Sequence, residues 1–380
     1  MYQNRGKVAI ITFHSAHNYG AMLQAYALQC TLREYGYYTK IINYRPRRID
    51  NNYRLFKTHI SPKEALKSLI ILFKYYSELK MRFSEFERFM KENFQLTSVF
   101  SDGDNLSILN SEFDCFICGS DQIWNTELID DDNYYLKFCS PEKRVSYAPS
   151  FGRSYIDEEK SNSLKERIDG IRALSVREVH GQNIIKKLTG RDSTVVLDPT
   201  MLLTIKKWKE LIGDPIIKTP YNLTYFLDQN PLNKKLIDKI KEQNGYPVIG
   251  MTPFIVNRDG IDKLVLNQGP LGFLNLIYYA ETICCSSFHG AVFSIMFNKV
   301  FYTISHRTRN SRIINLLKLV KLESRMIETP EDLNSVNITA KIDYTSVDNK
   351  ISKEREKSLS FLYESVDGAV INARGNRKCI

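Results

Sequence analysis

The sequence lacks any apolar run close to the roughly 18 residues that a membrane-spanning helix needs. It has no G-x-G-x-x-G after its first predicted strand and no Walker-type loop, which argues against a dinucleotide site and a P-loop. It also has no aromatic–basic repeat, so nucleic acid is not an expected partner. What remains is a globular protein of ordinary composition, 43% hydrophobic and 25% charged.

Cysteine is present without a pattern. The seven cysteines are odd in number and mostly lie inside apolar runs, at positions 30, 115, 118, 139, 284, 285 and 379. Reduced thiols in a cytoplasmic protein are therefore expected. Cys115 and Cys118 form a C-x-x-C inside a predicted strand, where side chains three apart point to opposite faces, so we expect no metal there. The short apolar segment that ends at His14 is expected to be a first strand rather than a signal peptide.

The charge balance is basic. In the 380 residues, 53 Lys and Arg stand against 43 Asp and Glu, a formal net charge of +10. This charge suits an anionic substrate or an anionic membrane surface, and a basic surface without a partner is the alternative. The length exceeds one ordinary core and predicts two domains.

Strands and helices are predicted to alternate along the chain. The first unit is a strand at 7–13, a helix that stops at Gly36 and a strand at 39–44, which makes a parallel βαβ unit. Further strands are expected at 113–118, 144–148, 173–177 and 194–197, with helices at 157–170 and 180–189. A second series has strands at 223–227, 247–251, 263–266, 282–285 and 300–303, and helices at 231–243, 270–280 and 290–297.

This order predicts two Rossmann-like α/β domains with parallel sheets and a ligand cleft between them. We expect an N-terminal domain at 1–212, with a helical insertion at 55–95, and a C-terminal domain at 213–380, with a final helix at 351–372. The insertion helix, opened by a capping box at 61–64, is both apolar and lysine-rich. Such a helix can lie on a membrane surface or pack its apolar face on the domain, and both interpretations stay open.

The segment Cys284-Cys285-Ser286-Ser287-Phe288-His289-Gly290 carries the clearest chemistry. It is predicted to be a strand end followed by a helix N-terminus, capped by Ser286 or Ser287. A helix N-terminus favours an anion, and His289 in its first turn can donate a hydrogen bond or move a proton. The alternative is that Ser287 only caps and His289 only packs.

Six motifs in order resemble one family. They are Asn18-Tyr19-Gly20, Gly119-Ser120-Asp121-Gln122-Ile123-Trp124, Ser146-Tyr147-Ala148-Pro149-Ser150-Phe151-Gly152, Ser175-Val176-Arg177-Glu178, Leu197-Asp198-Pro199-Thr200 and Ser286-Ser287-Phe288-His289-Gly290. Together they resemble the polysaccharide pyruvyl transferase family over about residues 7 to 320. The resemblance implies a glycosyltransferase-B-like (GT-B-like) pair of domains and transfer of pyruvate from phosphoenolpyruvate to a sugar. The product would be a ketal on a cell-surface polysaccharide or its lipid-linked precursor, made without a metal or another cofactor.

We assign roles to the motif residues as hypotheses. The expected catalytic residues are His289, as proton donor, and Asp121, as the base that takes the hydroxyl proton. The expected donor-binding residues are Arg177, Ser286, Ser287, Phe288, His289, Gly290 and Arg307. The expected acceptor-binding residues are His17, Asn18, Gly20, Ser120 and Gln122. For Asp121, Arg177, Asn18, Gly20 and Asp198 a purely structural role is the alternative, and for Asp198 the shaping of a turn is favoured.

One position departs from the family pattern. Several members carry Arg two residues before the histidine, where this chain has Ser287, which cannot replace a bidentate guanidinium. Arg177 and the basic run at 306–309 are the expected substitutes, unless the donor differs. A glycosyltransferase with a nucleotide-sugar donor and a non-catalytic glycan- or anion-binding relative therefore remain as alternatives.

Overall fold

The computed structural model describes residues 5–53, 62–153, 155–251, 259–305 and 311–377; the side chains of residues 52, 62–72, 376 and 377 are outside this description. Two compact units are distinguished by their internal contacts. Unit 1 comprises Met1–Arg54, Met90–Leu203 and Ser352–Ile380, and unit 2 comprises Leu55–Phe89 and Thr204–Ile351. These units differ from the predicted domains, because the insertion groups with unit 2 and the final helix groups with unit 1.

The sheet of unit 1 has the strand order β3-β2-β1-β4-β5 in the described residues, and every pairing is parallel. Its strands are β1 (Lys7–Ile11), β2 (Tyr38–Tyr44), β3 (Leu96–Phe100), β4 (Cys115–Cys118) and β5 (Arg144–Ser146). Two short parallel strands, β6 (Ser175–Val176) and β7 (Thr194–Val195), continue beyond β5 through a bridge between Val145 and Ala173. Its helices are α1 (Tyr19–Glu34), α2 (Arg47–Tyr53), α4 (Glu158–Asp169) and α5 (Val179–Thr189).

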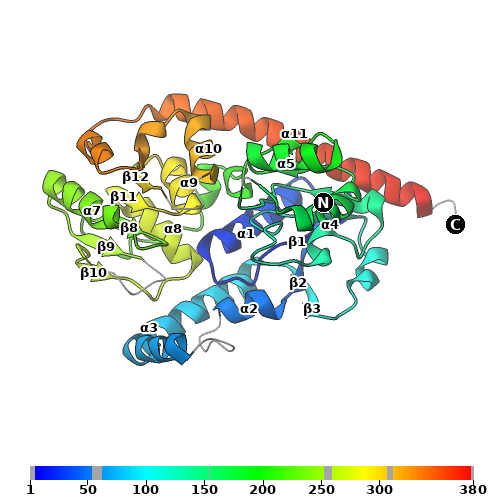
Figure 1. Cartoon of the computed structure of the whole chain (residues 1–380), viewed down its shortest axis with the longest axis horizontal. Helices are drawn as coiled ribbons and strands as arrows, with labels where there is room; N and C mark the ends of the chain where they lie inside the picture. The colour runs from blue at the N-terminus through cyan, green and yellow to red at the C-terminus, as the bar shows by residue number, and fades with distance from the viewer. Residues whose placement is uncertain (1–4, 54–61, 154, 252–258, 306–310, 378–380) are drawn as a thin grey trace. The chain divides into compact units, whose positions relative to one another are not determined.

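The sheet of unit 2 repeats the same order with one more strand, β10-β9-β8-β11-β12-β13, again parallel throughout. Its strands are β8 (Asn222–Tyr225), β9 (Val248–Gly250), β10 (Lys263–Leu264), β11 (Thr282–Cys285), β12 (Val300–Ile304) and β13 (Met326–Ile327). Its helices are α6 (Ile205–Lys209), α7 (Pro231–Asn244), α8 (Pro270–Tyr279), α9 (Phe288–Met296) and α10 (Ser311–Val320). Figure 1 shows β8, β9 and β10 side by side in this unit.

Two long helices link the units in sequence. α3 (Pro62–Asn93) starts at the predicted proline, while its predicted cap at Ser61 lies outside the described residues. α11 (Tyr344–Arg377), orange to red in Figure 1, is longer than the predicted final helix. In the described part of the chain, no helix combines the length and apolarity required to cross a bilayer.

The predicted α/β class with parallel sheets is confirmed. Every strand of the described residues except β3 and β13 was predicted to within a few residues. β3 was missed because only one of its five residues is buried and it follows closely after a helix, so it lacks the continuous apolar run expected of a buried strand. β13 has two residues, which is too short for any periodicity. α10 was not predicted either, although its residues Ile313, Leu316, Leu317 and Val320 are buried at helical spacing.

The last part of α11 is bound to unit 1 by polar and aromatic contacts. The Tyr37 hydroxyl donates to Asp367, and the rings of Tyr35 and Tyr363 stack with centroids 3.5 Å apart. Leu362 on the same helix is completely buried. The apolar face of α11 is therefore part of the core of unit 1.

Leu362→Ala should destabilise the protein by about 2–5 kcal/mol, because it leaves a cavity in a packed core. Ile371→Ala is the matched control, since Ile371 is on the same helix but 68% exposed, and its effect should stay within about 0.5 kcal/mol. Urea unfolding followed by circular dichroism measures both. Equal midpoints for the two variants would show that α11 is not part of the core.

Candidate functional site

The carboxyl ends of parallel strands bring the predicted polar motifs of unit 1 to one sheet edge. β1 and β4 are neighbours, with Ile11 opposite Cys118, although the chain between them passes through β2 and β3. Such a change in strand order is where open α/β sheets bind ligands. The segments that follow β4, β5, β6 and β7 deliver Asp121, Ser150, Arg177 and Asp198 to this edge.

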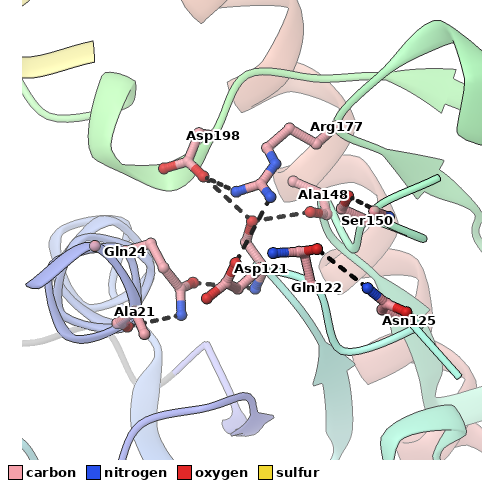
Figure 2. Close-up of polar contacts among 12 residues, drawn as sticks. Ala21, Gln24, Asp121, Gln122, Asn125, Ala148, Ser150, Arg177 and Asp198 are labelled. Carbon is pink, nitrogen blue, oxygen red and sulfur yellow. Dashed lines mark hydrogen bonds and ion pairs between the residues drawn. The ribbon is translucent and has the colours of Figure 1, made fainter. Parts of the chain in front are cut away.

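The loop after β4 is held from below by buried polar side chains. Gln24 on α1 accepts a hydrogen bond from the Ser120 amide (3.1 Å) and donates to the Thr12 hydroxyl (2.8 Å). The Thr12 hydroxyl donates in turn to the Ser120 carbonyl (3.1 Å). Figure 2 shows Gln24 reaching from α1 towards this loop. Gln24 was not predicted as a site residue. The sequence signal that could have identified it is a polar side chain among the apolar residues on the buried side of α1.

Backbone conformation also limits what this loop can contain. Gly119 has φ +129°, and a Cβ atom there would lie 2.0 Å from the Tyr147 carbonyl oxygen. Asp121 has φ +72°, in the left-handed region that non-glycine residues rarely occupy. Strained backbone of this kind concentrates at functional sites, which supports a functional interpretation of Asp121.

Arg177 lies among three carboxylates (Figure 2 shows those of Asp198 and Asp121). Its guanidinium nitrogens are 2.7 Å from Asp198, 3.6 Å from Asp121 and 3.8 Å from Glu178. Burial by itself would lower the pKa of Arg177, but the carboxylates of Asp198, Asp121 and Glu178 outweigh it and the pKa is raised. The cluster carries one positive and three negative formal charges.

Exposure separates the members of this cluster. The side chains of Asp198, Glu178 and Arg177 are 0%, 2% and 3% exposed, whereas that of Asp121 is 14% exposed. Asp121 is therefore the most exposed of these four side chains, and the one that a substrate hydroxyl can reach most easily. Arg177 and Glu178 are both buried, and the predicted contact of Arg177 with the donor stays a prediction.

The predicted acceptor-binding residues lie at the same edge, and several also have structural roles. The Asn18 side chain caps α1 by accepting from the amides of Gly20 (3.0 Å) and Ala21 (3.2 Å). The buried Ser120 hydroxyl donates to the Ala148 carbonyl (2.8 Å). Gln122 is half-buried and accepts from Asn125 (3.2 Å), and His17 is also half-buried. Their contacts with an acceptor stay predictions.

The corresponding edge of unit 2 carries the Ser286–Gly290 motif, located between β11 and the start of α9. Ser287 caps α9 by accepting from the Gly290 amide (3.3 Å), and Ser286 accepts from the Leu227 amide after β8 (2.8 Å). The strand end, the helix start and the serine cap are therefore confirmed. A Cβ at Gly290 would lie 3.1 Å from the Cys285 side chain, so the helix start packs closely on the end of β11.

His289 and the guanidinium of Arg312 lie near the start of α9. His289 is in the first turn of α9, 6% exposed, with its ring 5.1 Å from the ring of Phe288. The Arg312 guanidinium on α10 is 5.9 Å from the centre of the Phe288 ring. Arg312 was not predicted, whereas the predicted donor ligand Arg307 lies outside the described residues. Helix dipole and guanidinium together make this edge attractive to an anion.

Comparison with solved structures defines the class of fold. UDP-N-acetylglucosamine 2-epimerase from Rickettsia bellii is similar over 95% of this chain and 96% of its own, with a TM-score of 0.51 and 11% identity. The Neisseria meningitidis UDP-GlcNAc 2-epimerase bound to UDP-GlcNAc is similar over 95% and 98%, with a TM-score of 0.46 and 8% identity. UGT89C1 from Arabidopsis thaliana, complexed with UDP-L-rhamnose, is similar over 97% and 99%, with a TM-score of 0.45 and 13% identity. The fold is GT-B-like, as predicted.

Sequence comparison then defines the family. The profile of the polysaccharide pyruvyl transferase family matches residues 18–308. The chain belongs to this family, which makes it a transferase. No curated protein matches the chain significantly in sequence.

Gly119→Ala should destabilise unit 1 by at least about 2 kcal/mol, because the new methyl group meets a backbone carbonyl at a positive φ. Gly213→Ala is the matched control, since a Cβ there has no neighbour within 4 Å. Thermal melting of both variants measures the difference. A Gly119→Ala protein with an unchanged melting temperature would contradict the described loop.

Proposed function

We propose that the protein transfers pyruvate from phosphoenolpyruvate to a sugar of a cell-surface polysaccharide or its lipid-linked precursor, forming a pyruvate ketal. The observation that carries the proposal is the contrast between the two sheet edges. The edge of unit 2 combines a helix start, His289 and Arg312. The edge of unit 1 has three carboxylates around one guanidinium. A trianionic donor suits the first, and a neutral hydroxyl that must lose a proton suits the second.

The chemistry follows from these groups. In the proposed reaction His289 protonates the methylene carbon of the donor, which becomes the methyl group, and a sugar hydroxyl bonds to the adjacent carbon. Asp121 accepts the proton of that hydroxyl. Phosphate then leaves, and a second sugar hydroxyl takes its place to close the ketal. One hydroxyl proton balances the methyl group and the other leaves with inorganic phosphate.

A thermal-shift titration with phosphoenolpyruvate and with UDP-GlcNAc tests the donor. Phosphoenolpyruvate should stabilise the protein by about 2.7 kcal/mol at 100 times its Kd, and UDP-GlcNAc should have no comparable effect. Stabilisation by the nucleotide sugar alone would instead support a glycosyltransferase. Absence of either effect, in a folded protein with acceptor added, would favour a glycan-binding relative.

His289→Asn should bind phosphoenolpyruvate but lose at least about a hundredfold in transfer, since the amide can donate a hydrogen bond but not a proton. The control is His180→Asn, because His180-Gly181 is a second His-Gly pair in a first helical turn, that of α5. Phosphate release in the presence of acceptor measures transfer. If His289→Asn keeps nearly full turnover, the proton comes from another group.

We also propose that the protein acts at the cytoplasmic face of the membrane, through the middle of α3. There Phe73 is 94% exposed, Tyr76 45% and Met81 51%, next to the exposed Lys74 and Lys80. Aromatic and aliphatic side chains with neighbouring lysines favour an anionic lipid surface. A lipid-linked acceptor would be presented at such a surface.

Phe73→Ser combined with Tyr76→Ser should abolish flotation with vesicles that contain phosphatidylglycerol. The parent should float with these vesicles and not with pure phosphatidylcholine, because the lysines require anionic lipid. Ile108→Ser is the control, since Ile108 is 61% exposed but distant in sequence, in unit 1. Equal flotation of parent and double variant, or concentration-dependent dimerisation lost only in the double variant, would contradict the proposed membrane contact.

A further inference from the structure

We propose that Asp198 and Arg177 are positioning residues that hold the Ser120–Asp121 loop and act on the reaction through Asp121. The inference rests on the proposed function only in taking Asp121 as the base. It gives Arg177 a role different from the donor-binding role expected from the sequence.

Asp198 is anchored on its own side of the cluster. It is located between β7 and a 3₁₀ turn at Pro199–Met201, and its Oδ1 accepts from the Thr200 amide (3.0 Å) and the Thr200 hydroxyl (2.7 Å). These two bonds fix the carboxylate so that Oδ2 faces Arg177. The turn predicted from Asp198-Pro199 is therefore present, and the same aspartate also has a second function in the cluster.

The Oδ2 atom of Asp198 contacts Ser120 directly and is linked to Asp121 through Arg177. It is 3.5 Å from the Ser120 hydroxyl and 2.7 Å from Arg177 Nη1. The other terminal nitrogen of Arg177, Nη2, is 3.6 Å from Asp121 Oδ1. Polar contacts thus run from Thr200 through Asp198 and Arg177 to Asp121, which is far from them in the sequence. Figure 2 shows the part from Asp198 through Arg177 to Asp121.

Accessibility decides which of these groups acts directly. Asp198 and Arg177 are buried from solvent, while Asp121 retains an exposed fraction of 14%. A guanidinium that already faces three carboxylates gains little by leaving them for an anionic donor, because the carboxylates would then be left buried and uncompensated. Without Asp198, the Ser120 hydroxyl would lose its contact with Oδ2 and Arg177 would lose its closest carboxylate. The left-handed backbone at Asp121 would then lose part of the support that maintains it.

The first test does not require enzyme activity. In Asp198→Asn, amide hydrogen exchange of residues 119–125 should accelerate about tenfold or more, because the loop opens locally. Asp114→Asn is the matched control: Asp114 is also a buried aspartate near an arginine (Arg374, 3.5 Å), but it precedes β4 and so lies at the opposite sheet edge. Its substitution should leave exchange at 119–125 unchanged.

If Asp198→Asn does not fold, the milder variant Thr200→Val provides the same test. It removes only the hydroxyl that anchors Asp198 and keeps the side-chain volume. It should accelerate exchange of the same segment by a smaller factor. Unchanged exchange in both variants, or a uniform increase over the whole of unit 1, would overturn the positioning role whatever the reaction is.

A double-mutant cycle then tests whether the effect passes through Asp121. Asp198→Asn should lower kcat/KM for the acceptor about tenfold or more in the parent, but less than about threefold when Asp121→Asn is already present. The Kd for phosphoenolpyruvate should stay within about threefold of the parent value in Asp198→Asn. Additive losses in the cycle, or a tenfold weaker donor, would overturn the inference, the latter by favouring Arg177 as a donor ligand.

The two hypotheses can fail separately. If the parent shows no transfer from phosphoenolpyruvate, the proposed function fails, while the exchange experiment still decides whether Asp198 holds the loop. If transfer is observed but Asp121→Asn retains it, the base is misassigned and the positioning of Asp121 has no catalytic meaning. If transfer depends on Asp121 but the cycle is additive, the positioning role alone is wrong.

Discussion

Parallel pairing of central strands that are not consecutive in the chain is the constraint on which the two units depend. β1 pairs with β4 and β8 pairs with β11, so in each unit the loops after the two central strands emerge at one edge. Parallel strands present their carboxyl ends together, and their connections must return along the faces of the sheet. Polar residues of the loops therefore gather at each edge, while the apolar side chains of the strands pack on the two faces of the sheet.

The two edges differ in charge although they share a topology. In unit 1, successive strand ends bring Asp121, Arg177 and Asp198 into contact, and the buried guanidinium is retained because carboxylates compensate it. In unit 2, β11 leads directly into α9, so the edge presents a helix start with His289 and the nearby Arg312. Similar strand orders thus provide one acidic environment and one that favours an anion, and this contrast supports the proposed transfer.

Much of the fold could be predicted because the hydrophobic periodicity and the capping and turn residues that define helices and strands are local in the sequence. The βαβ start, the strand at β4 and the Ser287 cap are properties of contiguous residues, and each is present in the structure. The missed strands had little such signal, because β13 is only two residues long and only one of the five residues of β3 is buried. The missed helix α10 does bury residues at helical spacing. The position of the last part of α11 with unit 1 depends on contacts such as Tyr37 with Asp367, which sequence periodicity does not encode.

The sequence by itself determined the α/β class, the family and the motifs from which the candidate site is built, because strand ends and helix caps are local. Only the tertiary structure decided how those motifs face one another. Arg177, which the motifs predict to bind the donor, has Asp198, Asp121 and Glu178 as its neighbours in unit 1. Gln24, which holds the Ser120 loop, and Arg312, which lies near Phe288, carry no motif at all. Their positions follow from strand order and packing, which join residues distant in sequence and cannot be derived from spacing alone.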